Sequence, residues 1–509
     1  MTHPYSSAST TLKMGPANLC TVPVEVLIEI TSYLDTPSYC AFRLTCRGIE
    51  AAIFRTFAQK YFRKIRFMRT EFSLQALVDI SKSRLSSYLQ HVIISTRLLC
   101  PKRSFNARRP PVDERDNKLV KFNQLCSEQL VLLDTSHDQE MLAEAFRNLN
   151  LQEIEISEHT PTFFPSLTPV TYGMSYLLRE TSVDIKLDDV SSHSSQRRQN
   201  SSCIQNVLFA LGKSGSRPKR FVIEIYHSKF NDDTIHIPSF MNKVVSPVLS
   251  SLEAIEIRVG SRSTASIPDR LTQPTSDQLD TYHLRRFLSQ STQIKHLRLE
   301  QMAHFDGFFK WLVAPHLNES CGRFLGPEPA QPPMFADLHE LELGWIEVNF
   351  QDITAVIKKF SSTLRKMTLH DMTLILPDAS KTEFEEWPKA VASLARRARC
   401  LQKVHLDSIA IGAGHARRLM LFKDINGFSY AGPNMEKALG SIVDMLPEED
   451  EHEFSDYGDE EDEEIDGSDD EDLADFEEYL GYVDEYDDLL DGMDEGFAEE
   501  MMYQTLYGL

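Results

Sequence analysis

A short apolar pattern recurs along the middle of the chain and restricts the folds that the chain can adopt. In each copy an apolar residue is followed by a second one three positions later and by a third two positions after that. The seven copies are Leu89/Val92/Ile94, Leu151/Ile154/Ile156, Leu252/Ile255/Ile257, Ile294/Leu297/Leu299, Leu338/Leu341/Leu343, Leu364/Met367/Leu369 and Leu401/Val404/Leu406. A segment around Ile223 and Ile225 is a weaker member without the leading residue. Alternation of this kind is typical of a short strand with one apolar face.

Segments of helical character separate several copies, for example residues 352–363 and 387–399. One strand and one helix per unit, neither able to bury its apolar face alone, is the logic of a leucine-rich repeat. The last residues of successive copies from Ile257 to Leu406 are 42, 44, 26 and 37 residues apart, which indicates insertions. The asparagine or cysteine that usually follows the strand is missing. The pattern favours an irregular leucine-rich-repeat-like solenoid with a mostly parallel sheet, and an α/β domain whose strands merely share a pattern is the alternative.

The net charge of −23 belongs to one end of the chain. Of the 76 acidic residues, 29 lie between Glu448 and Glu500, a stretch without Lys or Arg, and the remainder carries 53 basic and 47 acidic side chains. We expect residues 445–509 to be an acidic, largely disordered tail, because this composition cannot offset the entropy of ordering. Apolar residues at helical spacing allow an amphipathic helix near 472–491. The tail is suited to a basic partner, or to the mildly basic body itself.

Motifs for secretion, membrane spanning and catalysis are missing from the sequence. The N-terminus lacks the apolar core of a signal peptide, and no stretch approaches the ~18 apolar residues of a membrane span. The eight cysteines include no CxxC pair. Gly212-Lys213-Ser214 ends like a phosphate-binding loop, but Val207 stands where that loop needs glycine. We expect a protein of the cytoplasm and/or nucleus without catalytic, cofactor-binding or metal-binding residues.

Two basic stretches, residues 101–121 and 191–220, are predicted to be exposed loops. They lack regularly interleaved aromatic residues, and the acidic tail would compete with phosphate, so nucleic acid is not the favoured partner.

Residues 21–34, TVPVEVLIEITSYL, allow two local interpretations. β-Branched residues on every second position favour a strand. Pro23 is better placed at the first position of a helix, and Val26, Leu27, Ile30 and Leu34 have helical spacing. In the residues that follow, Thr36 is the expected N-cap of a second helix and Pro37 its first residue.

With residues 19–49 in view, the segment resembles an F-box. Val22-Pro23-x-Glu25-Val26-Leu27 is similar to the family's Leu-Pro-x-Glu-Leu-Leu opening, and Leu44-Thr45-Cys46-Arg47 to its Val-Cys-Lys/Arg stretch. Three residues depart from the usual leucine, valine and tryptophan of the family: Tyr39, Thr45 and Ile49. The resemblance covers about 45 residues and selects the helix for residues 21–34. An F-box followed by leucine-rich-repeat-like units resembles one branch of the family, here its fungal members.

The resemblance implies a non-catalytic substrate receptor of an SCF-type cullin–RING ubiquitin ligase. The F-box would bind the Skp-type adaptor, and the repeat domain would bind a target protein. By this carry-over the residues that form or support the adaptor interface are Pro23, Val26, Leu27, Ile30, Phe42, Leu44 and Cys46. Strand side chains expected to point outward and to contact the target are Glu153, Glu155, Glu256, Arg258, Arg298, Glu340, Glu342 and His405. The rival hypothesis is a scaffold or histone-chaperone-like protein that binds basic partners through the acidic tail.

The expected organisation is therefore a disordered leader at 1–18, a three-helix F-box-like motif at 19–62, a leucine-rich-repeat-like domain at 63–444 and the tail at 445–509.

Overall fold

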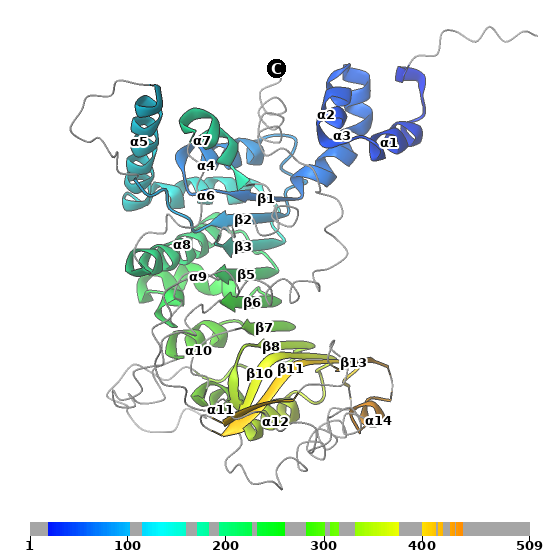
Figure 1. The fold of residues 1–509 in the computed structure, drawn as a ribbon, viewed down its shortest axis with the longest axis vertical. Coiled ribbons are helices and arrows are strands. Elements are labelled where there is room, and N and C mark those ends of the chain that lie inside the picture. Colours follow the sequence, from blue (N-terminus) through cyan, green and yellow to red (C-terminus); the bar gives the residue numbers. More distant parts are fainter. Residues whose placement is uncertain are drawn as a thin grey trace, which may run out of the picture.

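The computed structural model describes most of the chain between Leu19 and Gly440 (Figure 1). The described residues are 19–101, 114–158, 171–182, 193–225, 232–259, 281–300, 306–314, 331–375, 400–413, 416–420, 428–432 and 434–440. The predicted leader, the acidic tail and the predicted helix at 387–399 lie outside these residues. No helix formed by the described residues combines the length and the apolar character that crossing a membrane requires.

The chain begins with a group of helices. A 3-10 turn at Leu19–Thr21 precedes α1 (Val24–Ser32), α2 (Thr36–Leu44) and α3 (Arg47–Phe62). The helical interpretation of residues 21–34 is thus confirmed, with Pro23 one position ahead of the first helical residue. The prediction that Thr36 caps α2 is wrong, because the Asp35 side chain accepts the hydrogen bond from the Ser38 backbone N–H at 2.9 Å.

A parallel sheet follows, in which each main strand of the described residues lies beside the main strand before it in the sequence. Its nine successive strands are β1 (Lys64–Phe67), β2 (His91–Ser95), β3 (Glu153–Ser157), β5 (Arg220–Ile225), β6 (Ala254–Val259), β7 (His296–Glu300), β8 (Glu340–Gly344), β10 (Lys366–Ile375) and β11 (Lys403–Ala413). All seven copies of the apolar pattern and its weaker member end in strands of this sheet. The prediction of a mixed α/β fold with a mostly parallel sheet is confirmed, whereas the leucine-rich-repeat assignment stays a prediction.

Short strands extend the sheet at its edges and beside β10. β4 (Thr171–Tyr172) pairs in parallel with β1 at one edge, whereas β9 (Glu347–Asn349) follows β8 and pairs in parallel with the second half of β10. β12 (Ala416–Met420) and β13 (Phe428–Ala431) are antiparallel to β11. The sheet therefore loses its parallel character only at its last edge.

The connecting helices lie along one side of the strands (Figure 1). They are α4 (Glu71–Lys82), α5 (Glu114–Asp134), α6 (His137–Asn148), α7 (Met174–Thr181), α8 (His193–Ser214), α9 (Asn242–Leu249), α10 (Tyr282–Ser289), α11 (Asp306–Val313) and α12 (Phe350–Lys359), with 3-10 turns η3 (Asp232–Ile235) and η4 (Ser239–Met241). Helix α14 (Met435–Gly440) follows β13, the last described strand, and lies on the other side of the strands in Figure 1. The predicted helix near 352–363 corresponds to α12.

The prediction that both basic stretches are loops is wrong for most of the residues that the structure describes there, although residues 215–219 do form a loop. Residues 114–121 begin α5, and residues 193–214 form α8. In α8 the buried residues Cys203, Val207, Leu208 and Leu211 recur at helical spacing. The Ser- and Arg-rich first turns of this helix obscured that pattern in the sequence.

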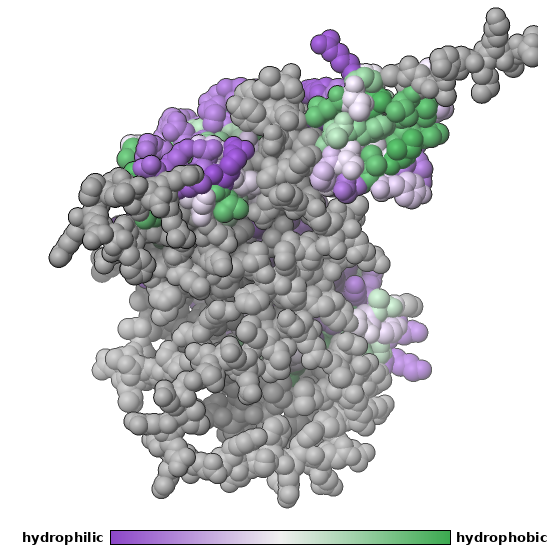
Figure 2. All heavy atoms as spheres, turned by 45° about the horizontal axis from the view of Figure 1, so that its top comes forward, coloured by the Kyte–Doolittle hydropathy of each residue, from purple (hydrophilic) through white to green (hydrophobic). Residues whose placement is uncertain are grey.

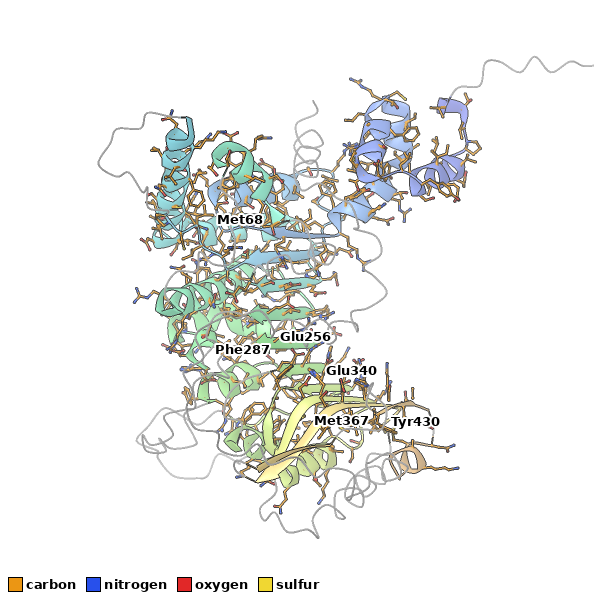
Figure 3. The ribbon with its side chains drawn as sticks, in the orientation of Figure 1. Met68, Glu256, Phe287, Glu340, Met367 and Tyr430 are labelled. Carbon is orange, nitrogen blue, oxygen red and sulfur yellow. The ribbon has the colours of Figure 1, made fainter. Side chains whose placement is uncertain are left out.

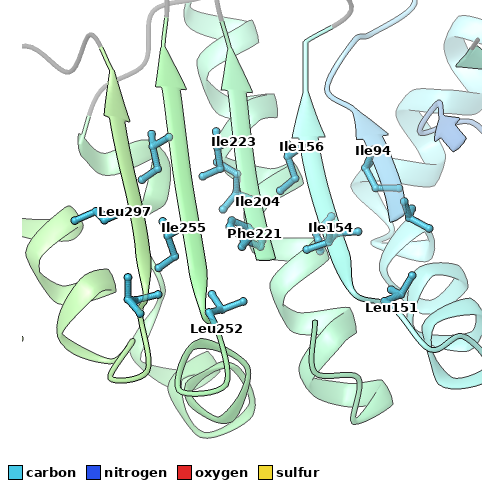
Figure 4. Packing of buried hydrophobic residues seen from close by; sticks show 14 of the residues in the cluster. Ile94, Leu151, Ile154, Ile156, Ile204, Phe221, Ile223, Leu252, Ile255 and Leu297 are labelled. Atoms are coloured by element: carbon cyan, nitrogen blue, oxygen red, sulfur yellow. The ribbon is translucent and has the colours of Figure 1, made fainter. Parts of the chain in front are cut away.

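The core lies between the strands and the helices, as Figure 4 shows for the middle of the sheet. Ile154 and Ile156 of β3 and Phe221 of β5 pack with Ile204 of α8 in one hydrophobic cluster, and each is fully buried. Burial of such side chains stabilises the fold by about 1.5–3 kcal/mol each. The alternate residues of the strands are thereby directed to the opposite face.

Candidate interaction surfaces

The apolar surface of α1 is wider than the core that covers it. At about 100° per residue, the apolar side chains from Val26 through Ile30, Leu27 and Val24 to Ile28 span about 200° of the helix circumference. Leu27, in the middle of this arc, is 3% exposed, whereas Val26 at one edge is 47% exposed and Ile28 at the other is 38% exposed. The flanks of the apolar arc are therefore left uncovered.

Further apolar side chains extend this surface over the neighbouring turns. Figure 2 shows hydrophobic residues gathered over the first three helices of the chain. The exposed large apolar residues there are Leu19, Val24, Val26, Ile28, Tyr33 and Leu44, and we call them together the N-terminal apolar surface. A contiguous surface of this kind on a folded domain marks a site for a protein partner.

The structure divides the predicted adaptor-contacting residues into three groups. Pro23, Val26 and Leu44 are exposed, and Val26 and Leu44 belong to the N-terminal apolar surface. Ile30, Phe42 and Cys46 are half-buried, and Leu27 is buried in the core. The Cys46 sulfur accepts a hydrogen bond from the Ile49 backbone N–H at 3.4 Å and so caps α3.

Four members of the N-terminal apolar surface were not among the residues singled out in the sequence: Leu19, Val24, Ile28 and Tyr33. The sequence pattern already included two of them, because Val24 and Ile28 belong to the alternating β-branched run that continues through α1. The apolar residues of α1 cover a wider arc of the helix than one buried face requires, and this comparison would have identified them.

Two of the three departures from the family pattern lie inside the domain. Tyr39 is 1% exposed and packs edge-on against Phe57, with ring centroids 5.9 Å apart. The guanidinium of Arg43 lies 4.0 Å from the centroid of the same Phe57 ring. Ile49 is 3% exposed, whereas Thr45 is exposed and bonds only to the Phe42 carbonyl through its hydroxyl. Tyr39 and Ile49 therefore contribute to the core of the helical group and not to its surface.

A second surface is the face of the sheet that the helices leave open. Its middle row, read in register across the strands, consists of Arg66, Ile93, Glu155, Val222, Glu256, Arg298, Glu342, Thr368 and His405. Two of the strand residues of this face, Glu256 and Glu340, are labelled in Figure 3. Neighbouring strands thus present opposite charges to each other at several positions, an arrangement that stabilises the sheet.

Ion pairs tie up much of this charge. Glu256 forms ion pairs with Arg220 and, at 2.7 Å, with Arg258. Burial raises the pKa of Glu256, but these two guanidinium groups outweigh burial and hold the pKa below its usual value. Glu155 accepts a hydrogen bond from His91 at 3.1 Å and lies 4.0 Å from Arg66. Its pKa is lowered in the same way, against the effect of burial.

All eight strand residues expected to point outward belong to this face, but Glu155 and Glu256 are only 5% and 1% exposed. Their charges are balanced by neighbouring strands. The remaining six are partly exposed: Glu153, Arg258, Arg298, Glu340, Glu342 and His405.

His370 occupies a special position on this face. Gly344, its register partner on β8, has no side chain, and a Cβ added there would lie 2.1 Å from His370 Cε1. The imidazole therefore lies across β8 and places Nε2 3.5 Å from Glu300 of β7, while Nδ1 is 3.3 Å from Asp371. Burial alone would lower the pKa of His370, but the two carboxylates outweigh burial and raise it to about 9.

Two groups of His and Glu side chains have ligand atoms close enough for a metal ion: His91/Glu153/Glu155 and Glu300/Glu342/His370. In the first group Lys64 lies 3.6 Å from Glu155, and in the second Arg298 lies 3.0 Å from Glu342. Both groups thus already contain a cationic side chain at the carboxylates. This donor set fits an ion-pair network better than a metal site.

The look-alike of a phosphate-binding loop lies at the wrong end of a helix. Gly212 to Ser214 are the last residues of α8, whereas a phosphate loop precedes a helix and uses its N-terminal N–H groups. Gly212 serves packing instead, because a Cβ at this position would lie 2.3 Å from the Val244 carbonyl oxygen of α9.

Comparison with known families adds one finding. Residues 19–63 match a family model described as F-box-like. No curated protein matches the chain. Helices α1 to α3, with the N-terminal apolar surface, therefore form an F-box-like domain.

Proposed function

We propose that this protein is the substrate-binding subunit of an SCF-type cullin–RING ubiquitin ligase. F-box domains generally bind Skp-type adaptors, and residues 19–63 form an F-box-like domain. The observation that carries the proposal is the uncovered apolar arc of α1, because a helix of this length in a folded domain normally keeps its apolar side against its own core. The adaptor is the partner that covers it.

The energetics of this contact follow from the exposed area. Val26 and Leu44 are each 47% exposed, so roughly half of the burial energy of each side chain is still available, or about 1 kcal/mol per residue. Six such side chains supply about 6 kcal/mol before the cost of association, so they form the apolar part of the interface and not all of its affinity. Leu27 acts differently: it holds α1 on the core, and the helix then presents its flanks.

In this proposal the sheet domain selects the target and performs no chemistry. We interpret the strand–helix units as an irregular leucine-rich-repeat-like array whose partly exposed strand side chains contact a target protein. The ligase then acts by holding the target's lysines near a ubiquitin-charged enzyme, which raises their effective concentration. The place of action in the cell is the cytoplasm and/or nucleus.

The decisive experiment is recovery of the adaptor with purified protein. A Val26→Asp/Leu44→Asp variant buries two carboxylates in the proposed interface, and we expect at least a tenfold weaker complex. The matched control is Val131→Asp/Leu178→Asp, which changes the same residue types at positions that are 62% and 50% exposed outside the F-box-like domain. Equal recovery by both variants, or no recovery by the wild-type chain, would contradict the proposal.

A second arm tests the ligase itself. Proteins that co-purify only when the proteasome is inhibited are the expected targets, and they should accumulate in cells that carry the Val26→Asp/Leu44→Asp variant. If the protein binds the adaptor but no such targets are found, the adaptor complex would stand and the proposed role in degradation would be refuted.

A further inference from the structure

Helix α3 and the residues just after it carry exposed basic side chains that wind around the helix. The exposed residues at every fourth position are Arg47, Ala51, Arg55, Gln59 and Arg63. They extend over about 24 Å at 1.5 Å per residue and turn by about 160° around the helix axis at about 100° per residue. Lys60 and Lys64 flank the line at its C-terminal end. We call Arg47, Arg55 and Arg63 with these two lysines the basic stripe.

No acidic residue on α3 neutralises the basic stripe. The helix has one carboxylate, Glu50, and this carboxylate forms an ion pair with Arg84. Among the described residues, Arg47, Arg55 and Arg63 have no ion-pair partner, although ion pairs are frequent elsewhere in the structure. The three arginines of the stripe are thus without an ion-pair partner among the described residues, whereas Lys64 lies 3.6 Å from Glu155.

The sequence supplies an anionic segment in the same chain. Residues 448–500 contain 29 acidic side chains and no Lys or Arg. We propose that this acidic segment docks on the basic stripe of α3 within the same molecule and so brings the two ends of the chain together.

The geometry allows the contact without strain. Helix α14 ends at Gly440 beside β13, which pairs with β11, and α3 leads directly into β1. Figure 1 places α3 and α14 at opposite ends of the molecule. β1 and β11 are eight strand steps apart, or about 38 Å.

The acidic segment begins 8 residues after Gly440 and extends to 60 residues after it. A flexible chain of 60 residues spans about 40 Å on average, and self-repulsion of the charges extends it further. The average span of the chain therefore matches the distance from β11 to β1, where the basic stripe ends at Lys64.

Zero-length carbodiimide cross-linking of the full chain tests the proposal, because this reagent joins carboxylates to amines that already touch. We expect links from carboxylates of residues 448–500 to Lys60 or Lys64. In a mixture of isotopically light and heavy protein, the links should join light to light and heavy to heavy only. Moderate salt, about 0.5 M, should abolish them, since the Debye length then falls below about 5 Å.

The variant Arg47→Gln/Arg55→Gln/Arg63→Gln should reduce the links about fivefold or more while both lysines remain. The control Arg147→Gln/Arg217→Gln/Lys243→Gln removes three exposed cations elsewhere and should leave the links unchanged. Links that persist in the first variant, or that reach other lysines instead, would overturn the proposal. Links between light and heavy chains would also overturn it, since the segment would then dock on a second copy. Circular dichroism confirms that both variants are folded.

Discussion

The buried imidazolium on the open face of the sheet predicts a specific dependence of stability on pH. His370 has a side chain that is 8% exposed and lies between the carboxylates of Glu300 and Asp371. Its pKa in the folded protein is about 9, against about 6.5 for an unperturbed histidine. The folded state therefore holds this proton more tightly than the unfolded state does.

The sign of the effect follows from proton linkage. Below pH 6.5 the imidazole is protonated in both states, and its contribution to the free energy of unfolding is fully present. As pH rises through 9 the folded protein also loses the proton, and the contribution disappears. A difference of 2.5 pKa units at about 1.4 kcal/mol per unit gives about 3 kcal/mol.

Urea unfolding of the wild-type chain and of a His370→Gln variant, followed from pH 6.5 to 9.5, measures this contribution. We expect the variant to be less stable by about 3 kcal/mol at pH 6.5 and the gap to close towards pH 9.5. The control is His405→Gln on the neighbouring strand β11. Burial lowers the pKa of His405, so substitution of this residue should not produce a gap in stability that closes between pH 7.5 and 9.5. A constant gap between wild type and His370→Gln would refute the charged state of His370.

Two further predictions concern packing inside the molecule. Arg69 and Asp138 form a buried ion pair at 2.7 Å, with side chains 1% and 0% exposed. Arg69→Leu leaves the carboxylate unpaired and should lower the free energy of unfolding in urea by about 3–5 kcal/mol, whereas the double variant Arg69→Leu/Asp138→Leu should recover much of this loss. A double variant no more stable than the single one would contradict this account. Leu27→Ala should destabilise the F-box-like domain by about 2–5 kcal/mol, because this side chain is buried. Val26→Ala should change its stability by about 0.5 kcal/mol or less, because this side chain is half exposed. Thermal unfolding of both variants measures the difference, and equal losses would show that Val26 also belongs to the core.

The sheet was predictable from the sequence because its signal is local. In a strand such as β3 the apolar positions Ile154 and Ile156 point to one face, and the leading Leu151 marks the turn before the strand. A residue pattern of six positions therefore contains the information needed. The prediction for α1 also succeeded, but only because the residues after it resemble an F-box, since the alternating valines and isoleucines equally fit a strand.

Other features depend on contacts between residues far apart in the sequence. Strands β10 and β11 continue beyond the apolar pattern for several residues, after a bend at Asp371 and Ser408. Both residues have positive φ angles, 50° and 46°, and Trp345 after β8 has one of 55°. These left-handed positions lie next to one another in neighbouring strands, and because none of them is a glycine, no residue type in the sequence indicated the bend.

The exposed side of the F-box-like domain also could not be separated from its buried side by sequence alone. The residues next to each apolar position of α1 do not distinguish buried from exposed positions. Only the packing of α3 against α1 decides which of these side chains are covered. Tyr39 illustrates this, because an aromatic ring in place of the usual leucine fits only where Phe57 and Tyr61 leave room for it.

The F-box-like domain is joined to the sheet without a flexible linker, and this has a consequence for the proposed ligase. Helix α3 ends at Phe62 and β1 begins at Lys64, so one residue separates the two elements. Contacts on the side reinforce the junction: the Arg84 guanidinium lies 3.9 Å from the centroid of the Phe54 ring, and Phe54 packs edge-on against Tyr88. A receptor that positions a target by effective concentration gains from such a connection, because the distance between adaptor and target surface is then fixed by the fold and not by the average extension of a linker.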